Sequence, residues 1–494
     1  MVDGASSKEI GISGFAAYLP RFRVDLQDWC CWTGDSWDKV RAVIGRGFRM
    51  RGSNENAYTM AATAVLRLIR QYQIDPQQVG FLGLGTESST DNSAGAVIVK
   101  GMVNDGLRRL GMAPLARACE VPEFKHACLG GVYALKAAGR YLAFDGADRV
   151  AIVVCADVAE YERATSGEPT QGAGAVAMLV ERAPRMLALE LELSGSASDY
   201  RGPDFRKPLN RFMRQTPTLF GQPKDFPVFN GKYSTTCYID EVLAALRDMF
   251  ARLRRHTAAG PARFLRDLSA TFLHRPYQRM AETGLIVGYL LALTVGDADD
   301  AAELRMYAER SEIDVNELTL ELTREPDVFA LVEQHKLGEE LYPLASRVAR
   351  QFRSEPRFAE LMTSLGVNSM QEVGNLYTAS LPAWMAAGLE EAAAAGVALT
   401  GTRILTLGYG SGDAAEAIPM RVLPGWEAAA ARIGFQQVLA DPIALTRADY
   451  EALHAGAEST ATIADDPGVF YIDRLGQRET HFDDSGIEYY RFTG

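Results

Sequence analysis

The sequence predicts an α/β protein made of two similar halves, each a mixed sheet covered by helices. The first observation is a set of continuous apolar runs of strand length, such as 149–157 and 172–181, typical of strands buried on both faces. The second is a helix-periodic segment just before the first of these runs, Val132 to Phe144. The third is that the order of these patterns recurs later in the chain. An internal duplication is the simplest interpretation.

The first half, predicted to span 1–185, begins with a strand over 10–20 that ends at a proline. Residues 54–72 show the apolar spacing of an amphipathic helix. The apolar run 79–85 then leads directly into a polar segment that contains Glu87. A carboxylate therefore stands where a buried strand ends, although an inert glutamate at a strand end is also common.

The second half, 186–494, repeats this order. An apolar segment ends at His274, and residues 374–380 open an alanine-rich helix. The runs 403–412 and 415–423 then correspond to the last two strands of the first half. In such α/β folds the polar residues at strand ends converge where the halves meet.

Two parts of the second half have no counterpart in the first. Between 287 and 369 lies a charged, helix-periodic insertion, expected to form surface helices and a dimer or partner contact. Its helices are expected over 301–313, 325–335 and 341–353. Two strand-like segments of the C-terminal tail, 469–472 and 489–492, are expected to add to the second sheet.

Composition excludes several classes of protein. A chain of 494 residues with 47% hydrophobic and 23% charged residues is typical of a globular protein, and its net charge of −12 argues against a general nucleic-acid binder. No apolar run is long enough to cross a membrane. Six cysteines without a CxxC pair, and no secretory signal, predict a reducing compartment and hence a cytoplasmic protein.

Cys128 is the strongest candidate for a nucleophile. It stands at the start of the predicted helix and is followed by Gly130 and Gly131, which allow close backbone packing. The unpaired N–H groups and the positive dipole end at a helix N-terminus favour a thiolate. The alternative is that Cys128 is a small core residue, as free cysteines usually are.

Several stretches together resemble the 3-hydroxy-3-methylglutaryl-CoA (HMG-CoA) synthase family. The matching stretches cover roughly 10–285 and 370–425. They are Gly-Thr-Glu-Ser at 85–88, Ala-Cys at 127–128, Pro-Thr-Gln-Gly-Ala-Gly-Ala-Val-Ala-Met at 169–178, Asp-Phe-Arg-Lys-Pro at 204–208, Phe-Pro-Val-Phe-Asn-Gly-Lys-Tyr-Ser at 226–234, His-Arg-Pro-Tyr at 274–277, Gly-Asn-Leu-Tyr-Thr-Ala-Ser-Leu at 374–381 and Tyr-Gly-Ser-Gly at 409–412.

This resemblance implies a thiolase-like fold of two αβαβα halves, a homodimer, and a Claisen condensation of acetyl-CoA with acetoacetyl-CoA that needs neither a metal nor another cofactor. Cys128 would carry the acetyl group. Glu87 would take a proton from the acetyl methyl group. His274 would hold the acetoacetyl-CoA ketone and protonate the new alkoxide, a role suited to an imidazole that titrates near neutral pH.

The resemblance also implies residues that bind the substrates. Backbone N–H groups of Cys128 and of the Gly410-Ser411 turn would stabilise the thioester oxyanion. Asn375 and Ser411 would position the acetoacetyl thioester. The alternative for Asn375 is that it only caps the following helix.

Four further residues are assigned by the same match. Asp157 and Asp204 would order the side chains around the reacting groups. Thr170 and Ser234 would lie near the CoA chain.

The chain also departs from the family pattern at three positions. Arg279 replaces a usual lysine and keeps a positive charge for a CoA phosphate, with fork geometry. Thr283 replaces a second lysine and removes a contact. Pro203 stands where a tyrosine is usual, which leaves the local turn uncertain, and Tyr200 is a candidate substitute.

Two functions with the same chemistry remain open. One is an HMG-CoA synthase of the mevalonate route. The other is a relative that installs β-branches in polyketides and takes its acyl groups from carrier proteins. Because carrier proteins are acidic, this alternative predicts a basic rim at the tunnel mouth. The residues available for it are Arg206, Lys207, Arg211, Arg214, Lys224 and Arg279. A non-catalytic scaffold is a remote third possibility.

Overall fold

Two runs of elements with the same order form the centre of the molecule. The computed structural model describes residues 9–89, 91–204, 226–362, 365–457, 459–478 and 483–494. The first run is β1 (Ile10–Tyr18), α3 (Ala57–Gln71), β4 (Val79–Gly85), α4 (Gly95–Arg109), α5 (Gly130–Ala143), β6 (Val150–Ala159) and β7 (Gly172–Arg182). The second run is β9 (Gly195–Ser198), α7 (Lys232–His256), β10 (Leu268–Leu273), α9 (Gln278–Thr294), α16 (Ser380–Ala394), β11 (Arg403–Gly410) and β12 (Ala414–Val422).

Strand pairing repeats along with the order of elements. In the first run β4 is parallel to β6, and β7 is antiparallel to both β6 and β1. In the second run β10 is parallel to β11, and β12 is antiparallel to both β11 and β9. The predicted duplicated α/β fold is therefore confirmed. The boundary between the halves at residues 185 and 186 stays a prediction.

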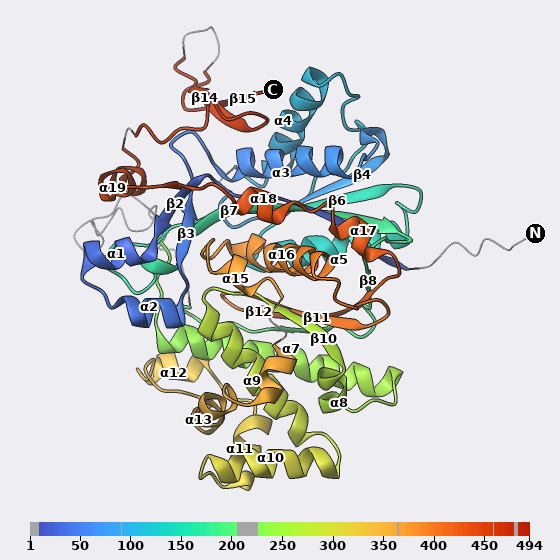
Figure 1. The fold of residues 1–494 in the computed structure, drawn as a ribbon, viewed down its shortest axis with the longest axis vertical. Coiled ribbons are helices and arrows are strands. Elements are labelled where there is room, and N and C mark those ends of the chain that lie inside the picture. Colours follow the sequence, from blue (N-terminus) through green and yellow to red (C-terminus); the bar gives the residue numbers. More distant parts are fainter. Residues whose placement is uncertain (1–8, 90, 205–225, 363–364, 458, 479–482) are drawn as a thin grey trace, which may run out of the picture.

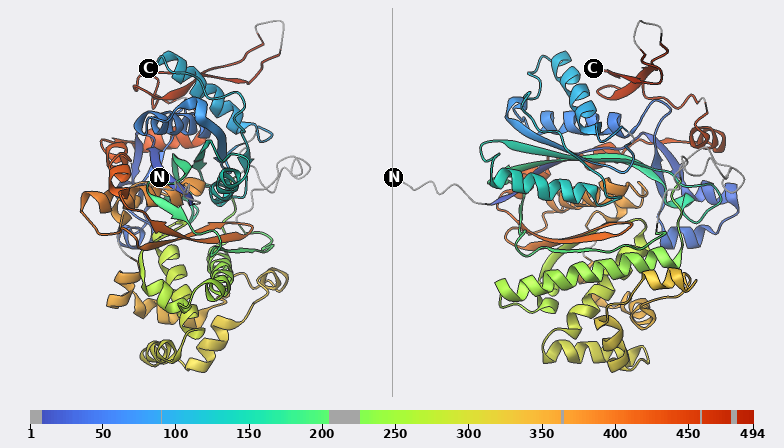
Figure 2. Two further views of the ribbon diagram at one scale, coloured as in Figure 1. Left: turned by 90° about the vertical axis from the view of Figure 1, so that its right-hand side faces the viewer. Right: turned by 180° about the vertical axis from the view of Figure 1, so that it is seen from behind.

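The elements stack in alternating layers of helices and strands (Figures 1 and 2). Helices α3 and α4 cover the first set of strands, α5 and α16 lie between the two sets, and α7 and α9 cover the second set. Strand β8 (Leu187–Leu189) pairs with both β1 and β12 and joins the two sets, while β5 (Glu123–Phe124) forms the far edge. The central helices therefore have strands on both sides, which explains their apolar sequences.

Local sequence explains where several of these elements begin. Asn56 and Thr59 form a reciprocal capping box at the start of α3. Residues 151–156 of β6 are all fully buried, as their unbroken apolar pattern predicts. Gly85 allows β4 to approach α5 closely, because a Cβ there would lie 2.4 Å from Gly131 Cα.

Most of the insertion forms a helical layer beyond α9, at the bottom of Figure 1, whereas its last helix packs against α16 in the centre of the molecule. Its helices are α10 (Ala298–Arg310), α11 (Val315–Thr323), α12 (Phe329–Glu333), α13 (Pro343–Phe352), α14 (Pro356–Leu361) and α15 (Val367–Met370). The predicted start at residue 287 was wrong, because α9 continues as a buried helix to Thr294. The predicted helix over 325–335 is also shorter, limited to Phe329–Glu333.

The expectation that the C-terminal tail adds two strands to the second sheet was wrong. Within the part of the chain that the structure describes, strands β14 (Phe470–Leu475) and β15 (Glu488–Phe492) pair with each other alone and pack on α3 and α4 in the first half. The Phe470 N–H donates to Thr63 Oγ1 at 3.1 Å, and the Ile472 N–H donates to Asn54 O at 2.8 Å. These contacts fix the hairpin far from the second set of strands.

A smaller unit at the side of the sheets forms one wall of a cleft. Strands β2 (Phe22–Asp25), β3 (Gly47–Met50) and β13 (Ile443–Ala444) make a three-stranded sheet, and helices α1 (Leu26–Thr33), α2 (Trp37–Val43) and α19 (Arg447–Ala455) lie beside it. The remaining helices are α8 (Pro261–Arg266), α17 (Trp426–Ala430), α18 (Phe435–Leu439) and the short 3₁₀ turns η1 (Pro76–Gln78), η2 (Glu168–Thr170) and η3 (Tyr377–Ala379). Among the described residues, none of the helices combines the length and apolar character needed to cross a bilayer.

Candidate active site

Cys128 lies in a tight turn just before α5. Ala127 has a φ of +40°, in the left-handed region that non-glycine residues rarely adopt. A Cβ on Gly131 would lie 2.2 Å from the Sγ of Cys155, so only glycine fits there. The thiol belongs to a small buried cluster with Ala159, Tyr161 and Tyr377, which is separate from the main core. This separate position does not support the alternative that Cys128 is an ordinary core residue.

Glu87 follows the end of β4 and reaches the same turn. Its Oε2 lies 3.8 Å from the Sγ of Cys128, within hydrogen-bonding distance for sulfur. The glutamate is half-buried. A carboxylate this close to the thiol could act on a group attached to the sulfur.

Asp157 is a buried hydrogen-bond acceptor that connects the two halves. Its Oδ1 accepts from Thr86 Oγ1 at 2.9 Å, from the Glu87 N–H at 2.8 Å, and from both the N–H and the hydroxyl of Ser88. Its Oδ2 accepts from the N–H of Thr378, in the second half, at 3.0 Å. Burial raises the pKa of Asp157, and these hydrogen bonds oppose that rise. Asp157 thus fixes the segment that carries Glu87.

His274 lies at the end of β10, where the duplication places the counterpart of the β4 end. Its N–H donates to Leu407 O at 2.7 Å, and its carbonyl accepts from the Tyr238 hydroxyl at 3.0 Å. The imidazole is 2% exposed, and burial lowers its pKa to about 3. The ring is therefore neutral at physiological pH, which corrects the expectation that it titrates near neutrality.

The Nδ1 atom of His274 is buried and has no hydrogen-bond partner in the described structure. The ring stacks beside Tyr409, with 6.3 Å between centroids and 23° between planes. Packing, rather than hydrogen bonding, therefore orients the imidazole. Contact of a ring nitrogen of His274 with a substrate atom stays a prediction.

Asn375 uses its side chain in two ways. Its Oδ1 accepts from the Tyr377 N–H at 2.9 Å and from the Ser380 hydroxyl at 3.0 Å, which caps η3. Its Nδ2 lies 3.5 Å from the Tyr161 hydroxyl, in the cluster around Cys128. The capping alternative is thus correct for the oxygen, while the amide nitrogen faces the reacting groups.

Gly410 and Ser411 lie at the end of β11, beside the Cys128 turn. A Cβ on Gly410 would lie 2.6 Å from His126 O and 2.9 Å from the Leu129 N, so glycine is needed for this close approach. Burial raises the pKa of Asp204, and a hydrogen bond from Ser411 to this carboxyl group opposes the rise. Donation of the Gly410-Ser411 N–H groups to an oxyanion stays a prediction.

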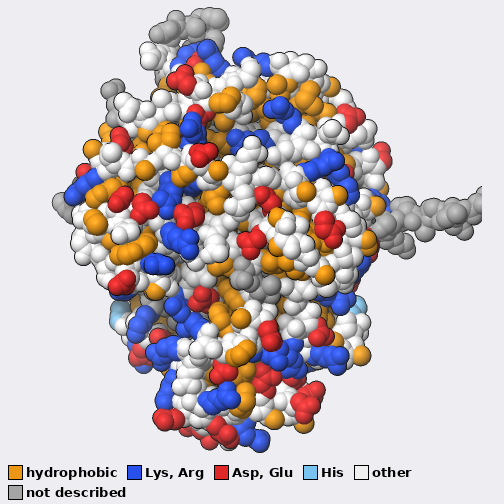
Figure 3. All heavy atoms as spheres, in the orientation of Figure 1, with side chains coloured by type: hydrophobic (Ala, Val, Ile, Leu, Met, Phe, Trp, Pro, Cys, Tyr) orange, Lys and Arg blue, Asp and Glu red, His pale blue; other side chains and the backbone are white. Residues whose placement is uncertain are grey.

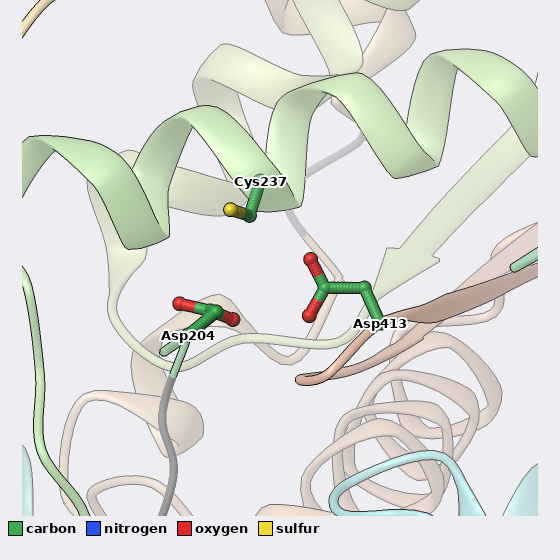
Figure 4. Close-up of side chains that lie close together, drawn as sticks. All are labelled: Asp204, Cys237 and Asp413. Atoms are coloured by element: carbon green, nitrogen blue, oxygen red, sulfur yellow. The ribbon is translucent and has the colours of Figure 1, made fainter. Parts of the chain in front are cut away.

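Asp204, Cys237 and Asp413 form a buried group (Figure 4). The Tyr409 hydroxyl donates to Asp204 Oδ2 at 3.0 Å. Burial and the neighbouring Asp204 raise the pKa of Asp413 to about 9, so the two carboxyl groups share a proton. Arg201 lies 3.8 Å from Asp413. A shared proton and a nearby guanidinium make this group a poor cation site, although its ligand-type atoms lie within 4.8 Å of one another.

A cleft of about 1600 Å³ reaches Tyr161, which packs in the cluster around Cys128. Tyr161 and Thr170 line it near Cys128, and Arg279 and Thr283 line it farther out on α9. Ser234 does not line the cleft; it hydrogen-bonds Asp204 instead. Of the predicted basic rim, only Arg279 lies among the described residues.

Sequence reasoning missed Tyr161 and Tyr377. Their rings pack edge to face beside Cys128, with 6.2 Å between centroids, and burial raises the pKa of Tyr161, as do the charges of Cys128 and Glu87. Tyr377 lies inside the Gly-Asn-Leu-Tyr-Thr stretch and Tyr161 lies four residues after Asp157. Their closeness to these motifs is the signal that could have identified them.

Comparison with known proteins agrees with this geometry. The model for the N-terminal part of hydroxymethylglutaryl-coenzyme A synthase matches residues 6–184, and the C-terminal model matches residues 345–472. Hydroxymethylglutaryl-CoA synthase of Haloferax volcanii is 28% identical over 406 residues, which cover 81% of this chain and 80% of the relative. The mitochondrial synthase of Sus scrofa is 29% identical over 428 residues, which cover 84% and 74%.

Solved structures agree on the fold. MvaS in complex with 3-hydroxy-3-methylglutaryl coenzyme A superposes with a TM-score of 0.76 at 27% identity, covering 98% of this chain and 99% of that one. The curacin pathway HMG synthase in complex with its holo donor-ACP gives a TM-score of 0.68 at 18% identity, covering 98% and 100%, and shares the fold. The two family models together span more than half of the chain. The protein therefore belongs to the hydroxymethylglutaryl-CoA synthase family and has its thiolase-like fold.

Proposed function

We propose that this protein condenses acetyl-CoA with acetoacetyl-CoA to give HMG-CoA and CoA, through an acetyl group held on Cys128. The observation that carries the proposal is the 3.8 Å contact between the Cys128 sulfur and the Glu87 carboxylate. A nucleophile and a base in this contact, beside a long cleft, suit transfer of an acyl group followed by removal of a proton from it.

The first half-reaction needs the thiol alone. The Cys128 thiolate attacks the acetyl-CoA carbonyl, the C–S bond to CoA breaks, and CoA leaves as its thiolate.

Glu87 then removes a proton from the methyl group of acetyl-Cys128. The Glu87 N–H donates a hydrogen bond to Asp157 Oδ1 at 2.8 Å, which keeps the Glu87 carboxylate beside the Cys128 sulfur.

The second half-reaction joins the two acyl groups. The carbanion attacks the ketone carbon of acetoacetyl-CoA, and the ketone oxygen takes the negative charge. Because His274 is neutral, its ring nitrogen donates a hydrogen bond to this oxygen without first carrying a charge, and Asn375 Nδ2 is available for the thioester oxygen. The alkoxide takes up a proton, which balances the proton that Glu87 removed from the acetyl group. Water then hydrolyses the thioester bond between the product and Cys128, giving the carboxylic acid of HMG-CoA and the free thiol.

The decisive experiment follows both half-reactions by mass spectrometry. With acetyl-CoA alone the intact protein should gain one acetyl group, and later addition of acetoacetyl-CoA should remove it and release HMG-CoA. Acetylation without HMG-CoA release would contradict the proposal. Acyl-carrier-protein donors, tested in parallel, decide between free CoA and carrier-bound substrates.

The homodimer expected from the family also stays a prediction. Analytical ultracentrifugation at micromolar protein should give a mass twice that of the chain. A monomer with full activity would contradict it.

A further inference from the structure

The segment between β6 and β7 carries Tyr161 into the cluster around Cys128. Tyr161 is 3% exposed, and its ring packs with Cys128, Ala159 and Tyr377. Its hydroxyl lies 3.5 Å from Asn375 Nδ2. Farther along the same segment, residues 163–170 line the cleft. The position of this segment therefore decides where the Tyr161 hydroxyl lies relative to Asn375 and to the sulfur.

Side chains hold the backbone of Tyr161. Strand β6 ends at Ala159 and η2 begins at Glu168, so Tyr161 lies outside both elements. Its N–H donates to Gln171 Oε1 at 3.0 Å, and its carbonyl oxygen lies 2.7 Å from His454 Nε2. Because a carbonyl oxygen only accepts hydrogen bonds, Nε2 carries the hydrogen in this contact. Both polar groups of the Tyr161 backbone thus depend on side chains from elsewhere in the chain.

Helix α19 supplies His454 and, one turn earlier, Tyr450. Both side chains are buried, and residues four apart share one face of a helix. The His454 ring stacks on Phe226, with 5.4 Å between centroids and 23° between planes, and also packs against Tyr450. The Tyr450 hydroxyl accepts a hydrogen bond from Gln171 Nε2 at 3.1 Å. One face of α19 therefore reaches the Tyr161 carbonyl directly and the Tyr161 N–H through Gln171.

Glu168 connects a second point of the segment to the same helix. Its carboxylate is buried, and Oε1 accepts from the Tyr450 hydroxyl at 2.6 Å and from Trp29 Nε1 of α1 at 3.3 Å. Its Oε2 accepts from the Ala164 N–H at 2.6 Å. Burial and the hydrogen bond to Glu168 raise the pKa of Tyr450, so the hydroxyl keeps its proton and stays a donor. The segment is thus held at both Tyr161 and Glu168.

The outer side of α19 resembles ordinary protein surface. Figure 3 shows charged side chains of both signs mixed with apolar ones at the upper left of this face, where Figure 1 places the helix. The hydrogen bonds to the segment lie on the inner, buried side, where the exclusion of water strengthens them. The inner face is therefore the one that bears on the cluster around Cys128.

We propose that His454 and Tyr450 are positioning residues, which place the Tyr161 hydroxyl beside Asn375 and the acyl group on Cys128. The hydroxyl accepts one hydrogen of the Asn375 amide and so directs the other hydrogen towards the thioester oxygen. The inference rests on the proposed function, because it assumes an acyl group on Cys128 and a thioester oxygen at Asn375. It gives α19, near the far end of the chain, a task in condensation that it performs through Tyr161.

Hydrogen exchange without substrate tests how firmly the segment is held. In His454→Leu, which lacks the donor, the amides of residues 160–171 should exchange about tenfold faster, as expected for the loss of one hydrogen bond. His454→Gln should exchange like the wild type, because its amide nitrogen can donate to the same carbonyl. His256→Leu, at an exposed position in the last turn of α7, is the matched control and should change nothing.

Single-turnover condensation tests whether His454 acts through Tyr161. Tyr161→Phe removes the hydroxyl and keeps the ring. His454→Leu and Tyr161→Phe should each slow the release of HMG-CoA from the acetyl-enzyme by about tenfold. The double variant should be no slower than Tyr161→Phe, because the position of the ring matters less once the hydroxyl is absent. His454→Gln should restore most of the rate.

Tyr450→Phe provides a second, milder test. It keeps the ring and removes the hydroxyl that joins Gln171 to Glu168. The same amides should exchange faster than in the wild type, and condensation should slow less than in His454→Leu, because the bond to the Tyr161 carbonyl remains. If His454→Leu does not fold, Tyr450→Phe, alone and combined with Tyr161→Phe, decides.

Three results would overturn the inference. The first is unchanged exchange over residues 160–171 in His454→Leu. The second is a double variant in which the rate losses of His454→Leu and Tyr161→Phe multiply. The third is a loss that His454→Gln does not restore, which would assign the residue to packing alone. A wild type that is acetylated but never releases HMG-CoA would contradict the proposed function, while the exchange measurement still decides whether α19 holds the segment.

Discussion

The two halves of the molecule have the same topology and provide opposite kinds of chemistry. At the end of β4, Glu87 is half-buried beside a thiol, in a segment that a buried carboxylate ties down through several hydrogen bonds. At the end of β10, His274 is buried and neutral, and its Nδ1 has no partner in the described structure. In the proposed reaction, the first site forms the carbanion and the second holds the ketone that the carbanion attacks.

This difference shows what a duplicated scaffold fixes and what it leaves open. The strand ends and helix starts of both halves deliver polar side chains to one place. Burial and neighbouring groups then decide whether a side chain there is a charged base or a neutral donor. The following variants test this division between the halves.

Cys128→Ala should give the largest effect, complete loss of the acetyl-enzyme, because no other group in the small cluster is a suitable nucleophile. Intact-protein mass spectrometry after incubation with acetyl-CoA measures this. Cys31→Ala is the control, since Cys31 is exposed, and it should acetylate normally. Any acetyl gain by the Cys128 variant would refute the assignment.

Glu87→Ala should separate the two steps. Acetylation of the thiol should survive, while condensation should fall by at least about 10², as expected for the loss of a general base. Single-turnover formation of HMG-CoA from the acetyl-enzyme measures the second step. Exposed Glu427→Ala serves as the control. Parallel loss of both steps would mean that Glu87 is only structural.

His274→Ala should leave acetylation intact and slow condensation by about 10², the usual cost of removing one oxyanion donor. Because burial lowers the His274 pKa to about 3, the ring stays neutral between pH 5 and 8. If His274 titrated near pH 6.5, the wild-type condensation rate would show an inflection there that the variant lacks. We expect no such inflection. Such an inflection, or a defect in acetylation alone, would require a different role. Exposed Arg263→Ala is the control.

Asp157→Asn tests the connection between the halves. An amide cannot accept all the hydrogen bonds that reach this carboxylate from Thr86, Glu87, Ser88 and Thr378. The free energy of unfolding should fall by about 2–3 kcal/mol, the cost of leaving buried polar groups unpaired. Urea denaturation measures it, with exposed Asp28→Asn as the control. An unchanged midpoint would contradict this role.

Asp413→Asn should give the smallest effect, a change in the pH dependence of stability. Because the folded Asp413 pKa is raised to about 9, the native protein holds a proton that the unfolded chain releases near pH 4. This contribution to stability is present at low pH and is lost as pH rises towards 9. The difference in Tm, variant minus wild type, should therefore become more positive from pH 5 to pH 8. Exposed Asp441→Asn should show no such trend.

Much of the fold could be predicted from the chain because its signals are local. The strand over 79–85 was predicted with the bounds that the structure has, since an apolar run ended by polar residues marks both ends. The tail strands were also found, but their partner was not. Pairing depends on contacts such as Thr63 with Phe470, which are far apart in sequence.

The sequence by itself determined the element order, the duplication, and the residue types at positions 87, 128 and 274. Local periodicity and motif spacing are sufficient for these. Tertiary structure alone decided the neutral state of His274, the hydrogen bonds of Asp157 and the hydrogen bond between His454 and the Tyr161 carbonyl. Each of these depends on burial or on a partner from a distant segment, because desolvation and hydrogen bonding act through space and not along the chain.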